Sequence, residues 1–289
     1  MIEVKCDGAF NINCVGVERL PFPLSFSVRE AEGSWMISAA AAQASELIDV
    51  LTHSSNDTVV IMDLATNSFL HEDYAQWRPS LIAADQGVDC IVHPVEAWAS
   101  HTVGLGDELL VMRRNSLRRF LGGGWSPYEL SLVDVPTVPS PAQLDEIALV
   151  IGTRKFDEPV LPRLKGSRFW YSGHDDCYLA IETTDPAMPA SILGRLLALL
   201  AGSALASAGT ASSARVPEPV GPMVDQLIRE SPHWIGAIAS ASEAAVTVQL
   251  SALSQRWRLG QEPPEQGDYT ATLDVARSVW QLDPAEGAR

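Results

Sequence analysis

The densest group of reactive side chains lies between Trp170 and Tyr178, where the sequence reads Trp-Tyr-Ser-Gly-His-Asp-Asp-Cys-Tyr. It brings together one imidazole, two carboxylates and one thiol. An imidazole beside a carboxylate can work as an acid/base pair or supply part of a metal site, because the carboxylate raises the basicity of the ring and fixes its tautomer. One hypothesis for this segment is therefore hydrolase-like catalysis by His174 with Asp175 or Asp176.

The same segment has two other interpretations. Gly, Asp and His are enriched in tight turns, so residues 172–176 also fit a plain hairpin turn. An acidic tip rimmed by aromatic side chains is, in addition, typical of a protein-binding surface. We favour this surface, because turn residues between two strands lie at an exposed tip where no wall excludes water from a reaction. It would consist of Trp170, Tyr171, His174, Asp175, Asp176 and Tyr178.

A second group is basic: Arg113, Arg114, Arg118 and Arg119 fall within seven residues of an otherwise acidic half of the chain. Their spacing predicts one face of a helix. Such a face can bind a carboxylate-rich surface or phosphates. It can equally balance acidic neighbours in internal ion pairs, and the sequence leaves both interpretations open. The group is too small for the extended basic footprint of a nucleic-acid-binding protein.

Sequence motifs for cofactors and metals are missing. No Lys precedes Ser or Thr, as a phosphate-binding P-loop requires, and Gly104 and Gly106 lack the third glycine of a dinucleotide-binding loop. The cluster His71-Glu72-Asp73 fits the first turn of a helix better than a set of metal ligands. We therefore expect neither a cofactor nor a metal.

Net charge restricts the class of partner. The 289 residues include 36 acidic and 20 basic ones, which gives a formal net charge of −16. Such a surface repels phosphate and anionic lipid and attracts a basic protein. We accordingly expect a basic partner protein, for example a toxin, and neither a membrane nor a nucleic acid. Four Cys without a Cys-x-x-Cys pair and a start that lacks the layout of a signal peptide predict a cytoplasmic protein.

The fold class can be predicted from the spacing of apolar residues, which changes between strand-like and helix-like along the chain. Short alternating apolar segments are interspersed with helical patterns, which predicts an α/β (α+β) protein. Three prolines between Pro136 and Pro141 forbid a regular element there. The chain is therefore expected to form two α/β lobes, 1–136 and 142–289, each with a mainly antiparallel sheet and packed helices.

The same patterns predict the individual helices and strands of each lobe. In the first lobe, an antiparallel meander is followed by a helix, a strand, a second helix and a last strand; in the second, a hairpin precedes a buried helix and two half-exposed strands. The predicted ranges are strands 2–6, 10–17, 24–28, 58–62 and 128–135 and helices 38–51 and 107–121 in the first lobe, then hairpin strands 168–171 and 177–182, helix 185–206 and strands 244–250 and 269–275 in the second.

The function expected from these features is binding. An acidic cytoplasmic protein can steer a basic partner to its surface and occlude it without chemistry, as a bacterial immunity protein, an antitoxin-type inhibitor or an assembly factor does. The alternative is the hydrolase-like enzyme that uses His174 with Asp175 or Asp176.

Overall fold

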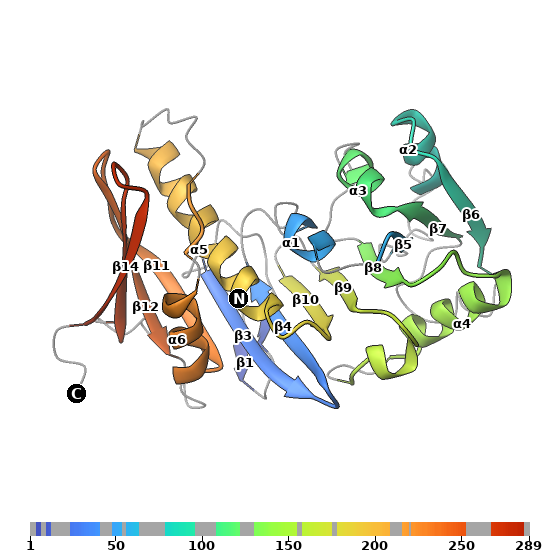
Figure 1. Cartoon of the computed structure of the whole chain (residues 1–289), viewed down its shortest axis with the longest axis horizontal. Coiled ribbons are helices and arrows are strands. Elements are labelled where there is room, and N and C mark those ends of the chain that lie inside the picture. The colour runs from blue at the N-terminus through green and yellow to red at the C-terminus, as the bar shows by residue number, and fades with distance from the viewer. Residues whose placement is uncertain are drawn as a thin grey trace. The chain divides into compact units, whose positions relative to one another are not determined.

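The computed structural model describes residues 4–6, 10–12, 24–40, 48–53, 56–63, 79–95, 108–121, 130–154, 158–174, 178–208, 216–219, 221–252 and 267–285. The protein is mixed α/β, and all strand pairs with a defined register are antiparallel, which confirms the predicted fold class at this level (Figure 1). The strands are β1 (Val4–Cys6), β2 (Phe10–Ile12), β3 (Leu24–Ala31), β4 (Ser34–Ala40), β5 (Thr58–Asp63), β6 (Cys90–Pro94), β7 (Glu108–Arg113), β8 (Leu130–Val135), β9 (Phe169–His174), β10 (Tyr178–Thr183), β11 (His233–Ala241), β12 (Ala245–Ala252), β13 (Tyr269–Asp274) and β14 (Val279–Pro284). The helices are α1 (Ile48–His53), α2 (Pro79–Asp85), α3 (Arg114–Leu121), α4 (Pro141–Gly152), the 3-10 helix Leu161–Arg163, α5 (Met188–Ser207) and α6 (Pro222–Glu230).

The chain divides into two compact units that are not contiguous in sequence. Unit 1 comprises Met1–Arg29, Ile37–Val50 and Ala187–Arg289, and unit 2 comprises Glu30–Met36 and Leu51–Pro186. The proline-rich segment 136–141 falls inside unit 2. The expected boundary between 1–136 and 142–289 stays a prediction.

Unit 1 is built on the strand order β14-β13-β12-β11-β3, with α5 packed against β11, β12 and α6. Strand β12 follows the alternation that its sequence predicts: Val246, Val248 and Leu250 are buried, while the residues between them are partly exposed. Strand β3 pairs with β11, so that Leu24 lies opposite Gly236. The expected meander is therefore wrong at this point, because β1 pairs with β2 in a separate small sheet while β3 joins a strand from the other end of the chain.

Helix α5 is apolar around most of its circumference. Its stretch Met188–Leu205 is long and apolar enough to span a membrane by length and composition, with a mean hydropathy of 1.5, and 61% of that stretch is buried within the structure. Leu193 and Leu197 are fully buried. Because α5 packs against two strands and another helix, its apolar surface is wider than the single stripe of a helix that is buried on one side.

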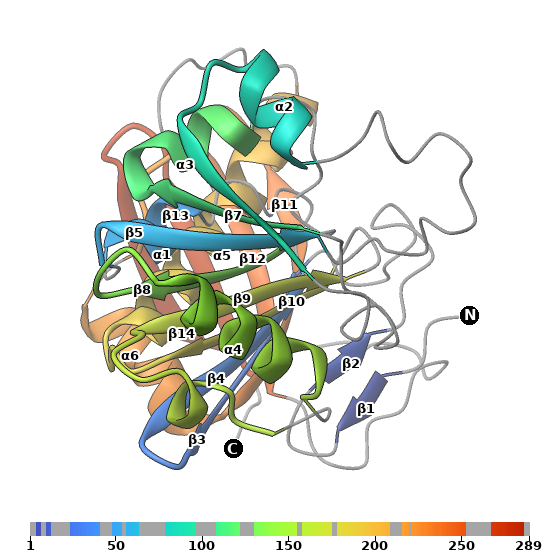
Figure 2. The same ribbon diagram turned by 90° about the vertical axis from the view of Figure 1, so that its right-hand side faces the viewer.

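Unit 2 is built on the strand order β10-β9-β8-β5-β7-β6. One face packs against α4 through a cluster that includes Val111, Val133 and Trp170 from the strands and Leu144 and Ile147 from the helix. Figure 2 shows α2 and α3 near β7, which both helices contact. Leu109 and Val111 of β7 lie in the cluster beneath α4. Because side chains alternate along a strand, Glu108 points to the opposite face, where its carboxylate binds Ser80 of α2. Helix α2 therefore covers the face opposite to α4.

Two expected helices are partly wrong. Residues 108–113 form strand β7, because the apolar run Leu109–Met112 is buried on both faces of the sheet, and such a run cannot be told from a helix by its period alone. Residues 38–40 end strand β4, where Ile37 and Ala39 are buried. Tertiary packing here overrides the helix propensity of alanine.

Candidate functional site

The predicted hairpin is present and longer than expected. Strands β9 and β10 pair in register from Phe169 opposite Thr183 to His174 opposite Tyr178, so Ser172, Gly173 and His174 continue the first strand. The backbones of His174 and Tyr178 therefore close the described part of the hairpin. The residues of the tip, 175–177, and the side chains of His174 and Tyr178 lie outside what the structure describes. Both the acidic tip and the acid/base group thus remain predictions.

The predicted aromatic rim of this surface loses two members. Trp170 is 4% and Tyr171 0% exposed. They are neighbours in a strand, so their side chains point to opposite faces of the sheet, and both faces of β9 are therefore covered. Neither side chain can contact a partner as a rim residue. Strand β9 is a central strand with both faces covered, so it buries consecutive aromatic residues. The prediction of an aromatic rim rested on the turn residues and missed this burial.

The base of the hairpin is a fixed polar and aromatic cluster. The Trp170 Nε1–H donates a hydrogen bond to Ser131 Oγ at 2.8 Å, and the Ser131 hydroxyl donates to the Tyr171 carbonyl oxygen at 3.1 Å. The Arg154 guanidinium lies 4.7 Å from the centroid of the Trp170 ring, and its Nη2 donates to Ser172 Oγ at 3.4 Å. These contacts join β8, β9 and the end of α4 below the tip. The described part of the hairpin is therefore fixed to its neighbours at its base.

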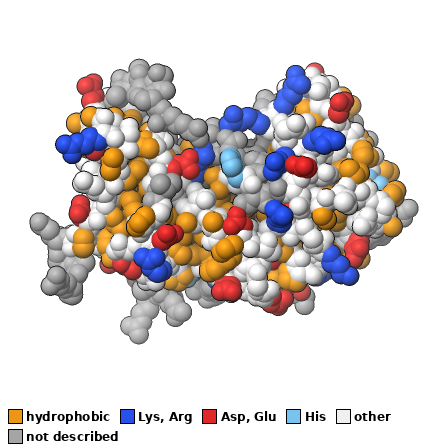
Figure 3. All heavy atoms as spheres, viewed as in Figure 1, with side chains coloured by type: hydrophobic (Ala, Val, Ile, Leu, Met, Phe, Trp, Pro, Cys, Tyr) orange, Lys and Arg blue, Asp and Glu red, His pale blue; other side chains and the backbone are white. Residues whose placement is uncertain are grey.

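The four arginines do not form one helix face. Arg113 is the last residue of β7, and Arg114, Arg118 and Arg119 belong to α3. Arg113, Arg118 and Arg119 are exposed, and Arg114 is partly exposed. In Figure 3, basic side chains gather over the region of α3. The arginines therefore form a basic surface patch, which combines the end of strand β7 with helix α3.

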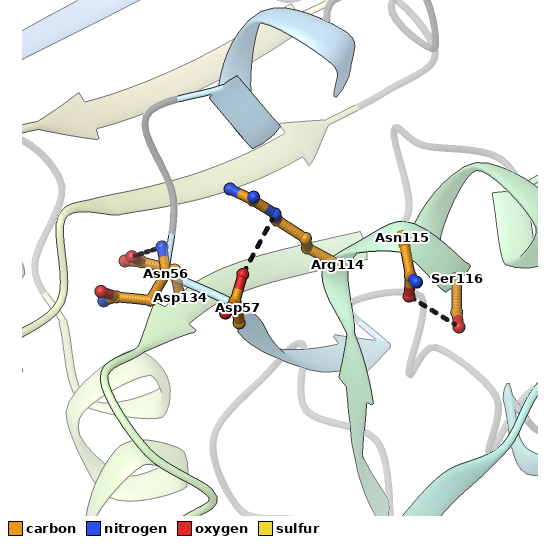
Figure 4. A network of polar contacts seen from close by, with 6 residues as sticks. All are labelled: Asn56, Asp57, Arg114, Asn115, Ser116 and Asp134. Carbon is orange, nitrogen blue, oxygen red and sulfur yellow. Dashed lines mark hydrogen bonds and ion pairs between the residues drawn. The ribbon is translucent and has the colours of Figure 1, made fainter.

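Arg114 has an acidic partner of the kind that the ion-pair interpretation requires. Arg114 Nε lies 3.5 Å from Asp57 Oδ1, and the Arg114 backbone N–H donates to the Asp57 carbonyl oxygen at 3.1 Å (Figure 4). Asp57 is 82% exposed, so water screens this pair. Arg119 Nη1 donates to the Gly87 carbonyl oxygen at 3.5 Å. Within the described part of the chain, Arg113 has no ion-pair partner.

Among the described residues of unit 2, three carboxylates are buried, and the first is Asp134, which is 0% exposed. Its Oδ1 accepts the backbone N–H groups of Arg168 at 2.6 Å and Phe169 at 2.9 Å, and its Oδ2 accepts that of Asn56 at 2.8 Å. Burial raises the pKa of Asp134, and the three backbone donors and the nearby Arg168 charge oppose that rise only in part. The carboxylate ties together the starts of β5 and β9.

Glu182 has the same role on β10, where it is 1% exposed. It accepts the hydroxyl of Ser34 at 2.7 Å and the backbone N–H groups of Val160 at 2.5 Å and Leu161 at 3.1 Å. These bonds fix the loop before the 3-10 helix.

The third buried carboxylate is Glu108, which is 6% exposed and accepts the backbone N–H and the hydroxyl of Ser80 at 2.8 and 3.0 Å. The oxygens of all three carboxylates are thus engaged by neighbouring backbone and hydroxyl groups. We assign them to the architecture of unit 2. A polar residue inside an apolar strand, as in Leu-Ser-Leu-Val-Asp-Val at 130–135, is the sequence signal that could have located them.

Neither a metal centre nor an activated thiol emerges from the described residues. No group of three or more His, Cys, Asp or Glu side chains among them is arranged to hold a metal ion. Cys90 is a free, partly buried thiol, and burial, followed by the charges of Glu108 and Asp89, raises its pKa. A thiol that stays protonated at neutral pH is a poor nucleophile.

Comparisons with protein-family models, with curated proteins and with solved structures find no match to this chain.

Proposed function

We propose that this chain is an acidic binding protein of the cytoplasm that recognises and occludes a basic partner protein, as an immunity protein, an antitoxin or an assembly factor does. The observation that carries the proposal is the distribution of charge. Unit 2 contains 21 acidic and 10 basic residues, a net charge of −11, whereas unit 1 contains 15 and 10, a net charge of −5. About two thirds of the net charge is thus concentrated in one unit.

The internal carboxylates do not account for this excess. Asp134, Glu182 and Glu108 are buried, which leaves 18 acidic against 10 basic residues in unit 2. An acidic surface of this kind raises the association rate of a basic partner through long-range attraction, and it repels phosphate and anionic lipid.

We propose that the hairpin tip is the contact within this field, with Asp175 and Asp176 flanked by His174 and Tyr178. Its support is the base around Trp170, where hydrogen bonds fix the strands that lead to the tip, because a surface carried on anchored strands loses less conformational entropy on binding. The Arg113, Arg114, Arg118 and Arg119 patch would lie outside this contact, since it repels a basic partner.

The finer architecture is also a proposal: two lobes, 1–136 and 142–289, each with its own antiparallel sheet. Limited proteolysis tests it, because exposed loop segments are cut first. Val138, in the proline-rich segment, is 59% exposed. Early cleavage within 136–141 that releases two stable fragments would support two lobes. Fragments that unfold at once would instead favour the discontinuous units.

The experiment that tests the function is capture of the partner followed by kinetics. Full-length chain is used to isolate a basic protein from the native host at constant stoichiometry, and association is then followed by stopped flow with the purified partner. Replacing both tip acids (Asp175→Asn with Asp176→Asn) should lower the association rate, and the difference from wild type should shrink as salt shortens the Debye length.

The matched control is Glu243→Gln with Asp283→Asn, which removes two exposed acidic charges from unit 1. This control should change the association rate less than the tip variant does. If both variants slow association equally, the contact is not at the hairpin. If no basic partner is bound and His174→Ala abolishes turnover of a substrate, the proposal is wrong and the hydrolase-like alternative holds.

A further inference from the structure

The sheet of unit 1 has two different faces, and α5 packs on one of them. Helix α5 shares a core cluster with Val246 of β12. Leu250 is on the same face of β12 and lies opposite Gly236 of β11, which in turn lies opposite Leu24 of β3. The even-numbered residues of β3 therefore face α5, and its odd-numbered residues face the other way.

The face of β3 that points away from α5 is polar. It carries Ser25, Ser27 and Arg29. The two serines are 4% and 2% exposed, and Arg29 is partly exposed. On the neighbouring strand β11, His233 lies opposite Ser27 and Ile235 lies opposite Ser25. Two adjacent strands thus bring two hydroxyls, one imidazole and one guanidinium to the same face.

Strand β4 adds a third buried hydroxyl. It neighbours β3 in the sheet, and the two strands are joined by Glu32 and Gly33, whose φ angles of 52° and 81° fit a two-residue hairpin turn. Counting along both strands from this turn places Ser38, which is 7% exposed, opposite Ser27. Ser38, Ser27 and His233 therefore form one row across three strands.

The hydroxyl of Ser25 indicates that this face serves a ligand. Its Oγ is buried and, within the described part of the chain, has no hydrogen-bond partner. An unpaired buried hydroxyl destabilises a fold, so such a group in a native protein calls for a bound ligand or an ordered water. Because Arg29 and His233 are partly exposed, a small molecule can approach the cluster from their side.

The cluster offers mainly hydrogen-bond donors. The guanidinium of Arg29 carries a positive charge and donates through its N–H groups but accepts no hydrogen bond. Burial lowers the pKa of His233, so its ring is neutral at pH 7 and offers one N–H. The hydroxyls of Ser25 and Ser27 can each donate one more hydrogen bond. Donors grouped around a cation fit a ligand that has only acceptors and a negative charge, which is an oxyanion.

Acidic side chains near this cluster point elsewhere. The described acids on this face of unit 1 lie at β13 or β14, which β12 separates from β11: Asp268, Asp274 and Asp283. Glu230, just before β11, bonds Tyr269, whose ring contacts Trp234 on the α5 face. Glu30 follows Arg29, and the alternation of the strand turns it to the α5 side.

From these features we propose that this face of unit 1 binds a small oxyanion, the phosphate or carboxylate group of a small molecule, through Ser25, Ser27 and Arg29. The His233 ring lies beside the bound group. Repulsion by the acidic surface is screened within about 8 Å at physiological ionic strength, whereas charge-assisted hydrogen bonds act at contact distance. The site is independent of the proposed basic partner, whose proposed contact is the hairpin tip.

Isothermal titration calorimetry of the full chain tests the proposal, with inorganic phosphate and acetate as separate probes and chloride at equal ionic strength as the blank. At least one probe should bind saturably with a dissociation constant below about 10 mM, and the tighter one identifies the group. Arg29→Gln and Ser27→Ala should each weaken binding about tenfold or more. The matched controls are Arg277→Gln and Ser240→Ala, which change exposed residues of unit 1 and should leave the affinity unchanged. No saturable binding of either probe, or equal weakening by the controls, would overturn the proposal.

Ser25→Ala separates a binding role of this hydroxyl from a structural one. In the absence of an oxyanion the variant should melt about 2–4 °C higher than the wild type, because it no longer buries an unpaired polar group. It should also bind the probe more weakly. Circular dichroism melting and the same titration provide the two measurements. A variant that melts lower and binds the probe with unchanged affinity would make the hydroxyl structural and the proposal wrong.

Discussion

Gly194 of α5 faces the carbonyl oxygen of Pro219 so closely that a β-carbon at position 194 would lie 2.6 Å from that oxygen. The segment 216–219 is held beside α5 by two further contacts. Arg195 Nη2 pairs with Glu218 Oε1 at 2.8 Å, and the Pro217 carbonyl oxygen accepts the Trp280 Nε1–H at 2.7 Å. A glycine in this helix thus allows an extended segment of backbone to approach its axis.

Gly194→Ala should therefore destabilise the protein by about 1–3 kcal/mol, because the added methyl group meets backbone rather than a flexible side chain. The measurement is the free energy of unfolding in urea. The control is Gly202→Ala in the same helix, where the nearest atom to the new β-carbon is Val216 Cγ2 at 3.6 Å. That change should stabilise the helix by about 0.5–1 kcal/mol. Equal effects at both positions would contradict the close approach.

Asp134→Asn should lower the free energy of unfolding by about 1–3 kcal/mol, because the amide turns one acceptor into a donor that opposes a backbone N–H. The neighbouring Asp57 offers a control, since its side chain is 82% exposed and water screens its ion pair with Arg114 (Figure 4). Asp57→Asn should stay within about 0.5 kcal/mol of the wild type. A similar loss in both variants would show that Asp134 does not organise the β5 and β9 starts.

The contribution of His233 to stability should fall as the pH is lowered from 7 to 5. Burial lowers the pKa of His233 below its usual 6.5, because it disfavours the imidazolium form. The unfolded chain therefore binds this proton first, so the contribution of His233 is complete above about pH 6.5 and is lost as the pH falls through the folded-state pKa. Urea unfolding of His233→Gln should show a flatter profile in this window. An unchanged slope would assign the pH dependence to other groups.

Arg114→Gln with Arg118→Gln should lower stability only modestly, by about 0–1 kcal/mol for each lost exposed pair, and should leave binding of a basic partner intact. Arg277→Gln, which removes the exposed pair of Arg277 with Asp274 in unit 1, serves as the reference for such a loss. Thermal melting and partner titration provide the two measurements. A large loss of affinity at unchanged melting temperature would make the arginine patch part of the interface.

Local signals predicted the local elements of this fold. Five turn-forming residues between apolar segments predicted the β9–β10 hairpin, and a β-branched run predicted β5. The sequence could not show that β3 would pair with β11, because that choice depends on packing between distant segments. It also could not show that Trp170 and Tyr171 are buried, since exposure is set by the elements that cover β9.

The arginine patch illustrates the same limit at a candidate site. The clustering of Arg113 and its neighbours could be seen in the sequence. The residues before them, however, were predicted as helix, whereas the apolar run Leu109–Met112 is a strand buried on both faces. The role of Asp134 was hidden for another reason. Its three donors are backbone N–H groups, which every sequence supplies and no motif reveals.

The pairing of β3 with β11 has a consequence for synthesis of the chain. The two strands are separated by roughly 200 residues, so β3 leaves the ribosome long before its partner exists. Residues 51–186, which form most of unit 2 and are contiguous, are complete by then and can fold first. Unit 1 must wait for its last segment, and until then β4 is the strand that neighbours β3, while the edge of β3 that later pairs with β11 has no partner strand. The nascent chain therefore carries β3 without its β11 partner through most of its translation.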